Sequence, residues 1–141
     1  MTVAGISTTF ASLTLDNAHF KSTQTNAPTI GTPTNCGTSP TAVFSVGSTD
    51  TAGSFTITVG TGGLSTTCNT VVTFNKPYAV APKSIIITFT QAIGGANVPL
   101  WFASIPASST TGFTIKEASL DLLGYNHAAG DIDSYYYCVV E

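Results

Sequence analysis

The stretch 54-SFTITVG-60 alternates strictly between apolar and hydroxyl side chains. Phe55, Ile57 and Val59 fall on one face of an extended chain, and the Ser and Thr residues between them fall on the other. Side chains of a β-strand point alternately to opposite sides of a sheet. The pattern therefore predicts a strand with one buried face and one open face.

Five further segments of the chain alternate in the same way. They are TVVTFN (70–75), SIIITFTQA (84–92), LWFASI (100–105), GFTIKEA (112–118) and SYYYCVV (134–140). Each segment is bounded by Gly, Pro, Asn or Ser, which favour turns. Many short strands at regular spacing predict an all-β fold, an antiparallel β-sandwich or jelly roll.

The chain carries very little charge for its size. Charged side chains make up 8% of the 141 residues, and there is no arginine. An ordinary soluble domain has about 25% charged residues. The net charge of -3 and the four scattered lysines disfavour a nucleic-acid partner. The apolar runs are far shorter than the roughly 20 residues of a membrane-spanning helix, so no membrane insertion is expected.

Strand length divides the chain into two parts. Residues 1–33 hold only short alternating pieces, ASLTL (11–15) and AHFKS (18–22), which are too small to cover each other within one chain. From residue 34 onward the strands lengthen and the aromatic residues gather. We therefore expect an extended N-terminal β arm over residues 1–33, which needs neighbouring chains, and a β-sandwich head domain over residues 34–141.

Five motifs follow one another over the second part of the chain. They are NCGTSP (35–40), GSTDTAGSFTITVGTG (47–62), TTCNTVVTFNKPYAVAPKSIIIT (66–88), STTGFTI (109–115) and DSYYYCVVE (133–141). Their order resembles the C-terminal β-domain of bacteriophage fibre and virion surface proteins. The sequence departs from that family in CNTVVTF (68–74), which has an extra residue before the strand, and in its CVVE ending.

The resemblance implies a structural protein at the virion surface, either a tail or head fibre tip or a capsid decoration protein, in which the arm anchors and trimerises. Its partners would be two further copies of itself in a homotrimer and other capsid or tail proteins. The alternative function is a carbohydrate- or receptor-binding module that recognises a host surface glycan or protein. Low charge suits a threefold axis, because like charges would meet their own copies, whereas Ser and Thr hydroxyls both donate and accept hydrogen bonds.

Cys36 and Cys68 occupy positions at which the resembled family often carries cysteines. The resemblance therefore makes them candidates for a disulfide, which would close a loop of about 30 residues and stabilise the fold by roughly 3 to 4 kcal/mol. Two reduced, buried thiols are the alternative, and the redox compartment decides between them. Cys138, between Tyr137 and Val139, is expected to be a buried strand residue. With no C-x-x-C pair and no histidine at ligand spacing, no metal site is expected.

His127, Asp131 and Asp133 lie close together in the sequence, and such a group could act in acid–base chemistry or bind a metal. We prefer to interpret it as a polar loop before the last strand, in which the Asp residues serve the turn. The chain contains no G-x-S-x-G, H-E-x-x-H or Walker A motif. We therefore expect no catalytic residues, no cofactor and no enzymatic activity.

Trp101 and Phe102 are candidate ligand or interface aromatics. An exposed aromatic ring could stack on a sugar, but the alternation of LWFASI (100–105) turns one of the two inward and leaves the other for a subunit neighbour. We favour a core or interface role over glycan contact. Tyr135, Tyr136 and Tyr137 alternate in the same way, which predicts that both faces of the last strand are covered.

Overall fold

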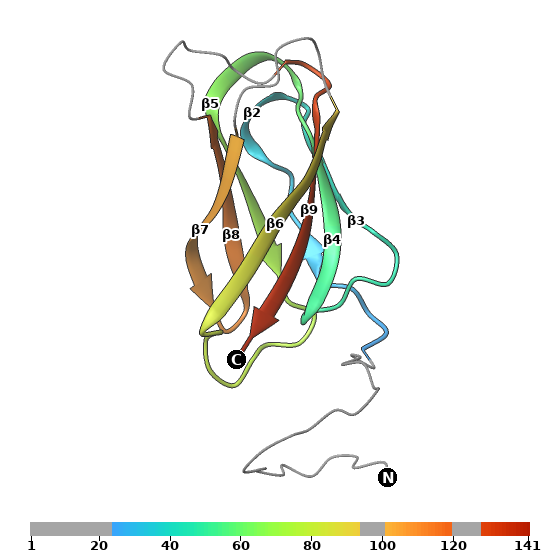
Figure 1. The fold of residues 1–141 in the computed structure, drawn as a ribbon, viewed down its shortest axis with the longest axis vertical. Coiled ribbons are helices and arrows are strands. Elements are labelled where there is room, and N and C mark those ends of the chain that lie inside the picture. The colour runs from blue at the N-terminus through green and yellow to red at the C-terminus, as the bar shows by residue number, and fades with distance from the viewer. Residues whose placement is uncertain (1–23, 94–100, 120–127) are drawn as a thin grey trace.

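The computed structural model describes residues 24–93, 101–119 and 128–141 (Figure 1). These residues form nine strands in two antiparallel sheets that pack face to face, which confirms the predicted β-sandwich. The first sheet, called here the β5 sheet, holds β1 (Thr29–Ile30), β2 (Thr34–Thr38), β5 (Thr61–Thr73), β7 (Trp101–Ser109) and β8 (Gly112–Ser119). The second, the β9 sheet, holds β3 (Thr41–Phe44), β4 (Ala52–Thr58), β6 (Ser84–Ile93) and β9 (Ile132–Val140).

Each sheet is organised around one inner strand. In the β5 sheet, β5 pairs with β1 and β2 along one edge and with β8 along the other, and β7 follows β8. In the β9 sheet, β9 lies between β4 and β6, and β3 pairs with β4. The last strand of the chain is therefore held along both of its edges.

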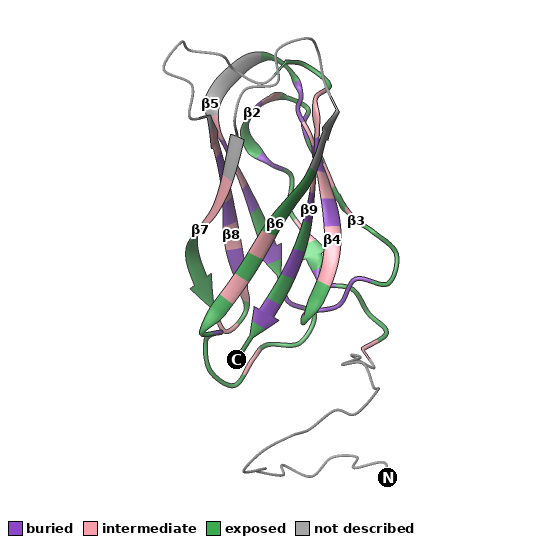
Figure 2. Cartoon of the chain, in the orientation of Figure 1, coloured by how far each residue is buried: buried purple, intermediate pink, exposed green. Residues whose placement is uncertain are grey.

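The alternation of SFTITVG is confirmed by the packing of β4 against β9. Phe55 and Ile57 are fully buried, and Val59, just past the end of β4, is nearly so. In the register of the two strands, Phe55 lies opposite Tyr135, and their rings stack with centroids 5.2 Å apart. Figure 2 shows the resulting purple bands alternating along the inner strands. Burial of one such side chain contributes about 1.5 to 3 kcal/mol to folding.

Residues 24–33, which the sequence assigns to the arm, lie against the sandwich. β1 pairs with the end of β5, with Thr29 opposite Thr73. Pro28 and Pro33 are buried. The boundary expected at residue 33 thus falls between two strands of the same sheet, β1 and β2. The rest of the expected arm, residues 1–23, lies outside the described residues.

The two ends of the sandwich differ (Figure 1). At one end, Gln24 and Glu141 line the same surface hollow, so the chain enters the sandwich where it also finishes. At the opposite end, Ile93 at the close of β6 lies opposite Ile132 of β9, and Trp101 at the start of β7 lies opposite Ser119 of β8. The connections from β6 to β7 and from β8 to β9 therefore leave from the end remote from the arm.

Candidate functional site

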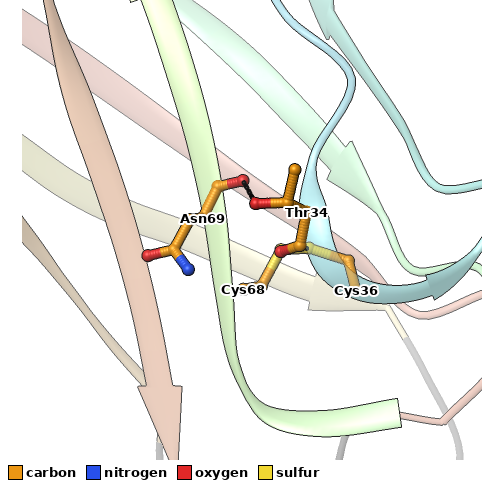
Figure 3. The surroundings of a disulfide bond; sticks show 4 residues. All are labelled: Thr34, Cys36, Cys68 and Asn69. Carbon is orange, nitrogen blue, oxygen red and sulfur yellow. Dashed lines mark hydrogen bonds between the residues drawn. A yellow bond between two sulfur atoms is a disulfide. The ribbon is translucent and has the colours of Figure 1, made fainter. Parts of the chain in front are cut away.

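A disulfide joins Cys36 of β2 to Cys68 of β5 (Figure 3). The two Cα atoms are 4.9 Å apart, and both side chains are buried. β2 pairs irregularly with β5 on either side of Cys36, because Asn35 and Gly37 have positive φ and the register shifts at both places. The hydroxyl of Thr34 donates to the carbonyl of Asn69 beside the bridge. The covalent bond therefore holds β2 where its backbone pairing is weakest.

Cys138 is exposed, and the expectation that it is buried was wrong. Tyr137 and Val139 of β9 point into the core, so the residue between them must point outward. The same alternation leaves Tyr136 with 61% of its surface exposed. The outer face of β9 is thus open in the single chain, so the expectation that both faces are covered requires a neighbouring molecule.

The structure places Asp131 and Asp133 in different surroundings. Asp131 precedes β9, and its Oδ2 accepts a hydrogen bond from the backbone N–H of Ala128 at 2.7 Å, as a turn residue does. Asp133 lies on β9 with 1% of its surface exposed. Their sequence neighbour His127 lies outside the described residues. The two carboxyl groups therefore do not share an open surface.

The backbone of Trp101 and Phe102 opens β7 at the end of the sandwich remote from the arm. Trp101 lies opposite Ser119 and Phe102 opposite Ala118. Their side chains lie outside the described part of the structure. The fold therefore places the backbone of both residues at the end of the sandwich remote from the arm.

Glu117 is a buried acid that the sequence interpretation missed. It lies on β8 with none of its surface exposed. The signal was present, because the alternation of GFTIKEA puts Glu117 on the same face as Phe113 and Ile115, both of which are in the core. Charged residues are almost never fully buried without a partner. Its position therefore needs a physical explanation.

Four polar side chains, here called the buried polar cluster, lie in the interior between the sheets. They are Thr70, Glu117, Asp133 and Tyr135, each at most 1% exposed. Thr70 and Glu117 belong to the β5 sheet, whereas Asp133 and Tyr135 belong to the β9 sheet. The hydroxyl of Tyr135 lies near the carboxyl of Glu117 without reaching hydrogen-bond geometry, and neither oxygen of Glu117 has a partner among the described residues.

Burial shifts the protonation of both acids in this cluster. Removal from water raises the pKa of Glu117 to about 8; the nearby Tyr135 hydroxyl opposes the shift and the charge of Asp133 adds to it. Removal from water also raises the pKa of Asp133 to about 7, with a further contribution from the charge of Asp131. The pKa of Tyr135 is raised for the same reason. Glu117 is therefore mostly uncharged at neutral pH, which removes the large cost of burying an unpaired charge.

Asp50 is the centre of a second polar group, at the end of the sandwich where the arm enters. Its Oδ1 accepts the backbone N–H of Asn75 at 2.8 Å, and its Oδ2 accepts the backbone N–H of Lys76 at 2.9 Å. Gln24 donates its Nε2 to the same Oδ2 at 2.7 Å and accepts the backbone N–H of Asp50. The carboxylate thus fastens the arm and the segment after β5 to the loop between β3 and β4.

Replacing Asp50 with Asn should lower the free energy of unfolding by about 2 to 3 kcal/mol. The amide keeps one acceptor oxygen and puts an NH₂ group in place of the other, so at least one of the three donors, from Asn75, Lys76 and Gln24, faces an N–H instead of an oxygen. Urea unfolding followed by circular dichroism measures the change. Glu141→Gln is the matched control, because Glu141 is exposed and accepts a single 3.4 Å bond from Val80. Equal unfolding midpoints for Asp50→Asn and the control would show that the carboxylate does not hold this end together.

The described residues contain no cluster of three or more His, Cys, Asp or Glu side chains placed to hold a metal ion. Within the described ranges there is also no helix with the length and apolar character needed to cross a membrane. No protein-family model, no curated protein and no solved structure matches the chain.

Proposed function

We propose that this chain is a structural protein of a bacteriophage surface, a fibre tip or capsid decoration protein, that acts as a homotrimer through attachment and display. The motif order over residues 35–141, which resembles the C-terminal β-domain of such proteins, supports the proposal. The observation that carries it is the difference between the two ends of the sandwich (Figure 1).

A displayed protein needs one end for attachment and another that faces outward. Here the chain enters beside Asp50, where Gln24 fixes it by two hydrogen bonds, so residues 1–23 are tethered to that end. The connections between β6 and β7 and between β8 and β9 leave from the other end. The end where the arm enters also holds the β3–β4 loop and the segment after β5, so the difference lies in the arm itself, which enters at one end and leaves the other for projection.

Four of the five acidic side chains that the structure describes also favour display over chemistry. Asp50 is occupied by three donors, and Asp131 serves the turn before β9. Glu117 and Asp133 are sealed between the sheets, where no substrate reaches them. General acid–base catalysis needs a titrating group within hydrogen-bond reach of the substrate. These four groups support an architectural role.

The proposal is tested by immunogold electron microscopy of virus particles purified from lysates in which the chain is produced, with an antibody raised against residues 24–141. We expect gold on the particle surface. A chain that stays abundant in the lysate but never labels a particle would overturn the proposal.

Deletion of residues 1–23 is the matching functional variant. It removes the expected anchor and leaves all nine described strands, whereas deletion of residues 1–33 would also remove β1 and the Gln24 bonds to Asp50. We expect the shortened chain to fold, as judged by circular dichroism, but to be absent from particles. Normal incorporation of the shortened chain would contradict an anchoring arm.

Recognition of a host glycan or protein is the second candidate function. It is favoured by one observation: Trp101 and Phe102 open β7 at the end remote from the arm, where a receptor would be met. Both residues carry aromatic rings, a type of side chain that can stack on sugars. Binding of the isolated chain to immobilised host-surface glycans would add this activity to display, and its absence would leave display alone.

A further inference from the structure

The side of the β9 sheet that faces away from the core, called here the outer β9 face, carries no charged residue. Its positions on β3, β4 and β9 and over residues 84–88 of β6 hold only Ser, Thr, Ala, Val, Ile, Tyr and Cys. Several of its apolar side chains are strongly exposed, including Val43 at 60%, Ile86 at 54%, Tyr136 at 61% and Val140 at 48%. Single exposed apolar residues are ordinary, whereas a group of them on one face indicates contact with another molecule.

The strand register makes Ile86, Tyr136 and Val140 neighbours, whereas Val43 lies on the outermost strand β3, opposite Thr56. Cys138 lies opposite Ile86 on one side and Ala52 on the other, so the three form a row across the sheet. Tyr136 and Val140 flank Cys138 two residues away along β9, on the same face. The result is a continuous apolar patch on an inner strand, surrounded by hydroxyl side chains.

The charged residues that the structure describes lie elsewhere. Lys116 belongs to β8 in the other sheet, and Glu117 and Asp133 are buried. Asp50, Lys76, Lys83 and Glu141 lie at the end where the arm enters, Lys83 and Glu141 just past the outer positions of β6 and β9, and Asp131 precedes β9 at the opposite end. A partner with a charged surface would find no counter-charge on the outer β9 face and would have to bury its own charges unpaired.

The absence of charge on the outer β9 face therefore indicates which kind of molecule binds there. Around a symmetry axis each side chain meets its own copies, so an interface with any charge near the axis would repel itself. A face of hydroxyl and apolar groups is complementary to a copy of itself. We propose that copies of this chain associate through the outer β9 face, with Tyr136, Cys138 and Val140 along the threefold axis. This inference rests on the proposed homotrimer and names the surface that builds it.

In this arrangement the long axes of the three sandwiches run side by side, so all three arms leave from one end and all three sets of loops from the other. The Cys138 thiols of the three copies face one another across the axis. Cys138 is the free one of the three cysteines in the chain, because Cys36 and Cys68 are joined. A single reactive thiol per copy makes the geometry measurable.

The first test crosslinks the unsubstituted full chain with a three-armed maleimide under non-reducing conditions. A reagent with two arms can join at most two chains through one thiol each, whereas three arms can join three. We expect a product of three times 14.5 kDa on a denaturing gel with the three-armed reagent, and its loss in Cys138→Ser. A native trimer that reacts with the reagent without forming any crosslink would overturn the proposed surface.

The second test compares Tyr136→Lys with Val71→Lys. Val71 is 53% exposed on β5, in the other sheet, and so provides a matched apolar position outside the outer β9 face. Light scattering of Tyr136→Lys should give a folded monomer, because three lysines would meet at the axis, while Val71→Lys should remain a trimer. Circular dichroism checks that both variants fold. If Tyr136→Lys does not fold, the crosslinking test on the unsubstituted chain decides whether copies meet at the outer β9 face.

The outcomes separate this inference from the proposed function. A trimeric Tyr136→Lys overturns the surface and leaves the homotrimer in place. A monomeric unsubstituted chain at micromolar concentration overturns both. A dimer that crosslinks through Cys138 supports the surface and overturns the number of copies.

Discussion

Raising the pH from 5 to 9 should lower the free energy of unfolding by roughly 3 to 6 kcal/mol, because the folded protein holds protons that the unfolded chain releases. Glu117 has a pKa of about 8 in the fold and 4.5 when exposed, and Asp133 has a pKa of about 7 in the fold and 3.8 when exposed. A raised folded pKa gives stability that is fully present below the unfolded pKa. That stability is lost as the pH rises to the folded pKa.

The slope of the free energy of unfolding against pH shows which groups cause the loss of stability. One proton held by the fold and lost by the unfolded chain changes the free energy of unfolding by about 1.4 kcal/mol per pH unit. The decline should be steepest between about pH 5 and 7, where both acids contribute, and should level off above pH 8. Urea unfolding at fixed protein concentration across this range measures it.

Glu117→Gln separates the contribution of this residue from general pH effects. The amide has nearly the shape of the protonated acid and does not ionise, so it should unfold much as the unsubstituted chain does at pH 5 and be the more stable of the two at pH 9. Glu141→Gln, at an exposed position, should leave the whole profile unchanged. Equal stability of the unsubstituted chain at pH 5 and pH 9 would show that Glu117 is not buried as the structure places it.

The strands were predictable because alternation is a local signal. In SFTITVG and GFTIKEA the residues at every second position are those found in the core. The same rule, applied strictly to SYYYCVV, would have turned Cys138 outward. Cysteine is a residue type that is often buried, but the phase of the strand outweighs that tendency at Cys138.

The buried polar groups and the disulfide were harder to predict than the strands. Asp50 receives its hydrogen bonds from residues 25 or 26 positions away in the sequence, and no local pattern encodes such contacts. Alternation alone could have predicted the burial of Glu117, but acidic side chains are almost never fully buried, and that tendency argues against it. The sequence could not decide whether Cys36 and Cys68 are bridged or reduced, because it does not reveal the redox compartment of the protein.

Breaking the bond between Cys36 and Cys68 should lower the free energy of unfolding by about 3 to 4 kcal/mol, because the unfolded chain regains the freedom of the closed loop. The sequence separation of the two cysteines is 32, which sets the size of that loop. A second effect acts in the folded state. β2 pairs with β5 through a shifted register on both sides of Cys36, so few regular backbone bonds remain to hold it once the covalent link is gone.

The test is the double variant Cys36→Ala with Cys68→Ala, unfolded in urea beside the unsubstituted chain with and without a reductant. The reduced chain and the double variant should unfold at similar, lower urea concentrations, and the variant should no longer respond to the reductant. Cys138→Ala is the control, since its exposed thiol takes no part in the bridge and its response to reductant should equal that of the unsubstituted chain. When the bridge is broken, amide hydrogen exchange should become faster in β2 than in the other strands, because β2 depends most on the bridge. An unsubstituted chain that unfolds at the same urea concentration with and without reductant would show that the bridge does not hold β2 against the sandwich.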